Sequence, residues 1–137
     1  MASFVKYYCA TEDLAEEVHN FASDTFKLAL TNTAPTLTHT TLSQISELLA
    51  GNGYSAGGAT ITVSSSSQSS GLYKWICSDA SITASGGDIG PARYAVLHNE
   101  TANRLVGYWD AGAEFTITSG NAWSADFDAT NGVIQVT

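Results

Sequence analysis

Residues 93–118 read RYAVLHNETANRLVGYWDAGAEFTIT, and this stretch decides the fold. It contains three short runs that are rich in β-branched and aromatic residues, at 93–98, 104–109 and 114–118. Residues that favour turns, at 99–103 and at Ala111-Gly112, separate the runs. Short strands at this spacing predict an antiparallel all-β arrangement rather than a parallel α/β sheet.

The same pattern continues on both sides of this stretch. Further strands are predicted at 26–32, 60–66, 72–77, 81–84, 122–127 and 133–136. Asn131-Gly132 is typical of a type I′ turn, so the last two of these strands are expected to form a hairpin. The serine-rich run 64–70 is interpreted as a solvated hairpin loop.

An N-terminal helical segment is predicted over residues 1–24. One stripe at alternating spacings of three and four contains Phe4, Tyr7, Leu14, Val18 and Phe21, with Thr11 as its single polar interruption. Ser3 is the expected N-cap. Acidic residues are expected to form the solvated face of this helix: Glu12, Asp13, Glu16 and Glu17.

A second, shorter helix is predicted near 41–49, with Leu42, Ile45 and Leu48 or Leu49 on its apolar face and Gly51 at its end. The expected fold class is therefore mainly β. We expect an antiparallel β-sandwich or jelly-roll-like barrel with an N-terminal helix and one additional short helix. The 137 residues suit a single domain, with residues 25–137 forming the sandwich.

The charge balance disfavours two classes of partner. Charged residues make up 13% of the chain, against about 25% in an average soluble domain, and the net charge is −8. The five cations are scattered along the sequence, whereas binding to phosphate needs clustered lysine and arginine. Neither nucleic acid nor an anionic membrane is expected as a partner. The sequence shows no signal peptide and no membrane span, which predicts synthesis in the cytoplasm.

The residues that could hold a metal are few and widely separated. Cys9 and Cys77 are interpreted as two free thiols. His19, His39 and His98 do not lie at zinc-ligand spacing. No metal and no cofactor is predicted from these residues.

Three patterns raise the question of catalysis or of calcium binding. Gly53–Gly57 matches the G-x-S-x-G nucleophile motif around Ser55, and Asp79 or Asp88 and then His98 follow in triad order. The predicted context, with a helix before and a strand after, is the reverse of what that motif needs, so a turn is favoured. A small hydrolase that uses Ser55 stays an unfavoured alternative.

The acidic pair Asp110 and Glu114 has the residue types of a glycosidase, but solvated strand ends are the ordinary interpretation. Residues 126–132 are similar to a calcium loop, but the glycine comes one residue late and the closing glutamate is absent. A turn with acidic flanks is the interpretation we favour there.

Aromatic residues supply the candidate contact sites. Those that face outward would serve as anchors at an interface or as platforms for sugars. The interface candidates are Phe4, Tyr7, Tyr8, Trp75, Trp109 and Trp123. No catalytic residue is predicted.

Five segments resemble a family of small proteins encoded among the structural genes of tailed bacteriophages. They are KLALTNTAP (27–35), LAGNGYSAGG (49–58), GPARYAVLHN (90–99), LVGYWD (105–110) and FD-x-x-x-GVI (127–134). The resemblance runs along nearly the whole chain in the same order. It implies a virion component and supplies no catalytic residues.

The function expected on this basis is that of a capsid decoration, or cement, protein on the capsid surface. Its partners would be the major capsid protein and copies of itself, as a homotrimer, with contacts to other virion proteins also open. The alternative is a tail or fibre-associated protein that binds host-surface glycans through exposed tryptophan and tyrosine.

Overall fold

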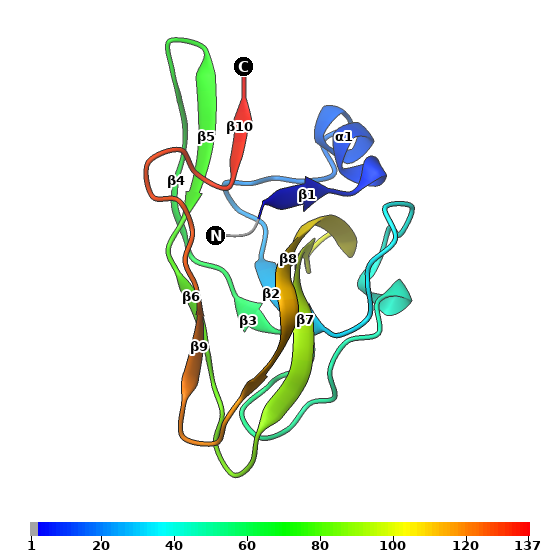
Figure 1. Cartoon of the computed structure of the whole chain (residues 1–137). Helices are drawn as coiled ribbons and strands as arrows, with labels where there is room; N and C mark the ends of the chain where they lie inside the picture. Colours follow the sequence, from blue (N-terminus) through cyan, green and yellow to red (C-terminus); the bar gives the residue numbers. More distant parts are fainter. Residues whose placement is uncertain (1–2) are drawn as a thin grey trace.

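A computed structural model describes residues 3–137, and in it the chain is mainly β with antiparallel strand pairs, as the sequence predicted (Figure 1). The elements in chain order are β1 (Phe4–Lys6), α1 (Tyr8–Ala15), β2 (Phe26–Thr31), the 3-10 helix η1 (Leu42–Gln44), β3 (Ala59–Thr60), β4 (Val63–Ser69), β5 (Leu72–Cys77), β6 (Ala80–Thr83), β7 (Ile89–Asn99), β8 (Arg104–Ile117), β9 (Ala122–Ala125) and β10 (Ile134–Val136). Within residues 3–137, no helix has the length and apolar character needed to cross a bilayer.

Within residues 3–137, the strands form three sheets. The main sheet has the order β1-β8-β7-β2-β3, a second has the order β10-β5-β4, and β6 pairs with β9. Figure 1 shows the long strands β7 and β8 at the centre, with β6 and β9 beside their lower halves. The β4–β5 hairpin extends upward, away from the main sheet.

The main core lies between one face of the main sheet and the smaller sheets. Alternate residues of β2, including Leu28 and Leu30, are fully buried in the same apolar cluster as Trp75 of β5. The Trp75 indole donates a hydrogen bond to the Phe21 carbonyl oxygen at 2.8 Å. This bond satisfies the one polar atom of a side chain that is otherwise surrounded by apolar groups.

A second, smaller cluster lies on the other face of the main sheet. It consists of Tyr7, Ile45, Val96 and Leu105. Val96 lies between Ala95 and Leu97 on β7, and those two neighbours belong to the main core. Because side chains alternate along a strand, β7 separates the two clusters and is buried on both faces.

The N-terminal helix begins later than predicted. Phe4 belongs to β1 and pairs with Trp109 of β8, and the helix starts at Tyr8 with Tyr7, not Ser3, as its N-cap. Residues 1 and 2 of the predicted segment lie outside the described residues. Pairing with the edge of β8 satisfies backbone groups that a first helical turn would have left without partners.

Asp13 is not on a solvated face. It is buried, and its carboxylate accepts two hydrogen bonds from Arg104 at 2.8 and 3.0 Å. This ion pair joins α1 to the start of β8. The Asp13 carboxylate can be buried because both of its oxygens accept a hydrogen bond from the Arg104 guanidinium.

The predicted helix over 41–49 is wrong except for the single turn η1. Thr31 of β2 forms a bridge with Glu47, and the Leu48 amide donates to the Leu30 carbonyl oxygen at 3.0 Å. The segment after η1 therefore lies along the edge of β2 in extended form. Gly51 forms a tight bridge with Tyr54 and does not terminate a helix.

Two further predictions, one of strand pairing and one of a loop, are wrong. The last two strands do not form a hairpin, because β9 pairs with β6 and β10 pairs with β5. The serine-rich run is the strand β4 and not a loop. Its register against β5 places Ser66 opposite Trp75, and the turn that follows uses Ser70 and Gly71, both with positive φ.

Candidate functional site

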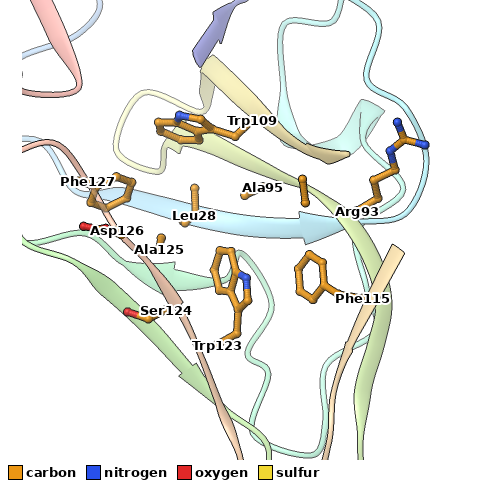
Figure 2. Close-up of a pocket in the computed structure, with 11 residues that line it drawn as sticks. Leu28, Arg93, Ala95, Trp109, Phe115, Trp123, Ser124, Ala125, Asp126 and Phe127 are labelled. Atoms are coloured by element: carbon orange, nitrogen blue, oxygen red, sulfur yellow. The ribbon is translucent and has the colours of Figure 1, made fainter. Parts of the chain in front are cut away.

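A hollow with a mainly apolar and aromatic lining lies in a cleft between β9 and the central strands β7 and β8. It has a volume of about 360 Å³. Leu28 and Ala95 form its floor, and both belong to the buried core. Figure 2 shows Trp109, Phe115, Trp123 and Phe127 around these two residues, so aromatic rings form the walls of what we call the aromatic cleft.

The four rings form two contacting pairs. Phe115 and Trp123 are stacked, with centroids 5.7 Å apart and 9° between their planes. Trp109 and Phe127 are tilted at 41°, with centroids 5.6 Å apart. Each pair joins β8 to β9 or to the segment that follows it, so the walls are held by side-chain packing across the cleft.

A bulge in β8 shapes the opening. Tyr94 pairs with Asp110 and Ala92 pairs with Phe115, so Arg93 alone on β7 faces residues 111–114 on β8. Gly112 in this bulge has a φ of 88°, and its amide donates to the Asp110 carboxylate at 2.8 Å. Bulges bend a strand and redirect its side chains, which accounts for the approach of Phe115 to Trp123.

The charged residues at the rim neutralise one another in part. Arg93 donates to both carboxylate oxygens of Asp110, at 2.8 and 3.1 Å. These hydrogen bonds hold the pKa of Asp110 below its usual range. Ser124 and the exposed Asp126 complete the polar part of the lining. The cleft thus has an apolar floor, aromatic walls and a narrow polar rim, which is the usual character of a binding pocket.

The chemistry that this lining offers is the binding of an apolar group. Ser124 is the one hydroxyl residue among the lining residues, and its oxygen donates to the Ala80 carbonyl oxygen at 3.4 Å. No histidine, cysteine or second hydroxyl lines the described cleft beside it. A nucleophile with an adjacent base, the arrangement needed for covalent catalysis, is not formed by these residues.

The structure separates the six predicted interface residues into three groups. Trp109 and Trp123 line the aromatic cleft, and Phe4 packs on Trp109 with ring centroids 4.8 Å apart. Tyr8, on α1, is 65% exposed and lies outside the cleft.

Tyr7 and Trp75 require a correction. Both are 0% exposed, so they have no surface to offer a partner. Trp75 fills the main core, and Tyr7 fills the smaller cluster beneath α1. A large aromatic side chain contributes most to stability when it is completely buried, and both of these side chains are completely buried.

Phe115, Phe127 and Arg93 also line the cleft and were not singled out from the sequence as site residues. The two phenylalanines lie on predicted strands. A list of interface candidates that contained every aromatic residue of the predicted strands would have included both. Nothing in the local sequence signals Arg93, because its part in the rim depends on the bulge opposite it.

The residues of the G-x-S-x-G pattern do not assemble a triad. Ser55 is exposed in a turn, as the sequence predicted, and neither a strand before it nor a helix after it is present. The His98 ring nitrogen Nε2 is bonded to the Gly57 carbonyl oxygen at 2.8 Å. The Asp88 and Asp79 carboxylates accept hydrogen bonds from the Ser119 and Phe127 amides.

The other acidic candidates also have separate partners. Asp110 pairs with Arg93, while Glu114 accepts a hydrogen bond from the Asn32 side chain at 3.0 Å. In the calcium-like segment, Asp128 accepts hydrogen bonds from the Asn131 and Thr130 amides, and these lower its pKa. Residues 3–137 contain no cluster of three or more side chains suited to a metal ion.

Both cysteines are free thiols in the structure, as predicted. Cys77 lies in the main core, where burial raises its pKa to about 12. Cys9 is half-buried, and burial raises its pKa as well. Reactive cysteines depend on the thiolate form, so a raised pKa makes these thiols poor nucleophiles at neutral pH.

Comparison with known proteins gives no match, whether the chain is compared with family models, with curated proteins or with solved structures. The aromatic cleft and the surface of the chain itself are therefore the basis for a functional proposal.

Proposed function

We propose that this chain is a non-enzymatic structural protein of a tailed-phage virion, and specifically a capsid decoration protein that binds across junctions between capsid subunits. The aromatic cleft is the observation that carries the proposal. It is a preformed apolar hollow whose floor and walls are set by core residues and stacked rings, as anchor pockets at protein interfaces are. The resemblance of five ordered sequence segments to phage structural proteins supports the virion as its location.

In this proposal the cleft receives an apolar side chain of the major capsid protein. Complete burial of a leucine or phenylalanine side chain contributes about 1.5–3 kcal/mol. The Arg93–Asp110 pair at the rim stays satisfied within the chain, so docking leaves no new charge without a partner. Repeated at every capsid junction, such contacts add up and oppose separation of the subunits.

The surface composition supports the same role. Residues 48–73 contain no Asp, Glu, Lys or Arg, although the chain carries a net charge of −8. Leu49 projects from this neutral region and is 92% exposed. Neutral hydroxyls and amides lose less hydration energy than charges do when a partner covers them.

The proposal includes an arrangement of the three sheets in two layers. We interpret the main sheet as one layer of an open antiparallel sandwich and the sheets β10-β5-β4 and β6-β9 as the other, with the main core between them. The strands β1 and β3 are the outermost strands of the main sheet, and within residues 3–137 neither pairs with a further strand, which favours an open sandwich over a closed barrel.

Two measurements test the proposal. In a reconstruction of purified virions in which this chain carries a label, the label should appear on the outer face of the capsid. The purified protein should also co-sediment with capsids that lack it and saturate at a fixed number of copies. A label on the tail, or no co-sedimentation with capsids, would reject the decoration role.

A second candidate, binding of host-surface glycans by a tail or fibre-associated protein, has one specific observation in its favour. Trp109 and Trp123 are half-exposed at the cleft, and within residues 3–137 neither indole N–H has a hydrogen-bond acceptor. Such rings can stack on a sugar while the N–H binds a hydroxyl. A glycan array in which wild type binds and Trp123→Ala does not would favour this candidate over the first.

The non-enzymatic part of the proposal is tested at Ser55. Ester substrates should show no turnover above buffer with either wild type or Ser55→Ala. Capsid binding should be the same for both. Turnover by wild type that the substitution abolishes would reject this part of the proposal.

A further inference from the structure

The strand β4 presents an open sheet edge. It pairs with β5 on one side and is the outermost strand of the sheet β10-β5-β4. Within residues 3–137, no backbone hydrogen bond joins Val63–Ser69 to any segment other than β5. Figure 1 shows the β4–β5 hairpin extending away from the main sheet, and no residue of Val63–Ser69 is buried.

This edge lacks the features that normally prevent strands of different molecules from pairing. Soluble proteins protect an open edge with charged residues, proline, bulges or a very short strand. Residues Val63–Ser69 contain no charge and no proline. The bulge lies at the start of the strand, between Val63 and Ser65, and residues 65–69 then keep an unbroken register with β5.

The distribution of charge favours another copy of this chain as the partner. Each copy carries a net charge of −8, so contact between two copies generally brings acidic surfaces together. The segment 48–73, which includes all of β4, is free of charged residues. An interface formed on β4 therefore avoids most of this repulsion.

We propose that β4 pairs antiparallel with β4 of a second copy across a two-fold axis, which joins two three-stranded sheets into one six-stranded sheet. A strand that pairs antiparallel with its own copy is self-complementary, as a two-fold interface requires. Ser67 is the middle residue of the regular segment 65–69, so the two Ser67 residues are expected to lie opposite each other near the axis. The added ladder satisfies backbone groups that otherwise rely on water.

The test is the mass of the protein in solution. Sedimentation velocity over a range of concentrations should show a reversible dimer for wild type. Ser67→Lys places two like charges opposite each other near the axis, which should raise the dissociation constant roughly fivefold or more. Ser119→Lys adds the same charge to an exposed turn outside β4 and should leave the dissociation constant unchanged.

A second variant covers the case in which Ser67→Lys impairs folding. Ser67→Cys in a Cys9→Ala background should form a cross-linked dimer under mild oxidation, and Ser119→Cys in the same background should not. A wild type that remains monomeric at concentrations on the order of 1 mM would overturn the inference. A trimer, which the sequence analysis led us to expect, would overturn the inference in favour of that expectation. A dimer equally stable in the Ser67→Lys and Ser119→Lys variants would overturn it too.

This inference is independent of capsid binding. Ser67 is not among the residues that line the aromatic cleft. Co-sedimentation of Ser67→Lys with capsids therefore reports on the proposed function, while sedimentation velocity reports on the dimer. Each can fail without the other.

Discussion

The ring of Phe115, near the end of β8, lies parallel to the ring of Trp123 in β9, with centroids 5.7 Å apart and 9° between the planes. Residues 118–121 make the turn between the two strands. The stack therefore connects the main sheet to the β6–β9 pair at the place where the chain passes from one to the other. It also forms one wall of the aromatic cleft, so stability and binding depend on the same two rings.

Loss of either ring should lower stability by an intermediate amount. Both side chains are half-buried, so Phe115→Ala and Trp123→Ala should each lower the free energy of unfolding by about 1–3 kcal/mol, less than a fully buried aromatic would. Urea denaturation of both single variants and the double variant gives their coupling energy, expected at about 0.5–1.5 kcal/mol. Simple additivity of the two losses would contradict a direct interaction between the rings.

The buried ion pair should be far more sensitive to loss of one partner than the exposed pair. Arg104→Gln leaves the Asp13 carboxylate, which is 4% exposed, without its charged partner and should cost about 2–4 kcal/mol. Adding Asp13→Asn to this variant should recover part of that loss, because it removes the unpaired charge. Arg93→Gln, at a pair that is 38% and 39% exposed, is the matched control and should change the urea midpoint little.

Mild acid should destabilise the protein through two buried histidines, His19 and His98. Burial lowers the pKa of His19 and of His98 below the ordinary value of about 6.5. The unfolded chain therefore binds more protons as the pH falls below about 6.5, so stability present at pH 7 declines toward pH 5. The lowered pKa values of Asp110 and Asp128 act only below about pH 4, outside this window.

Urea midpoints at pH 7 and pH 5 measure this effect. The midpoint of wild type should be lower at pH 5, and His98→Gln should show a smaller difference between the two pH values. The same midpoint at both pH values would show that the two histidines titrate alike in the folded and unfolded chain.

The sequence predicted correctly those strands in which the local pattern of apolar residues determines which side chains are buried. β2 and β5 begin and end within one residue of the predictions, because alternating or continuous apolar residues there leave one arrangement that fills the core. The mainly β, antiparallel character followed from the same pattern. In the cleft, Trp109 and Trp123 were named in advance because they are aromatic residues on predicted strands.

The other elements depend on pairing between segments that are far apart in the sequence. A short stretch of sequence does not contain the information that determines such pairing. Asn131-Gly132 favours a local hairpin, yet the Val133 amide donates to the Trp75 carbonyl oxygen at 2.8 Å, and β10 joins β5 instead. The serines of β4 have the composition of a loop and become a strand because β5 offers partners along its length. Asp13 looked solvated because its partner, Arg104, is 91 residues away in the sequence.

The proposed function requires that the capsid protein occupies the aromatic cleft, and one pair of variants tests this requirement. Ala111 lines the cleft and is exposed in the β8 bulge, so Ala111→Trp should block the opening without disturbing the core. Ala113 is exposed in the same bulge and does not line the cleft, which makes Ala113→Trp the matched control. Co-sedimentation with capsids that lack this protein should fall at least about tenfold in affinity for Ala111→Trp and stay at the wild-type value for Ala113→Trp. Equal binding by both variants would contradict the claim that the cleft receives the capsid protein.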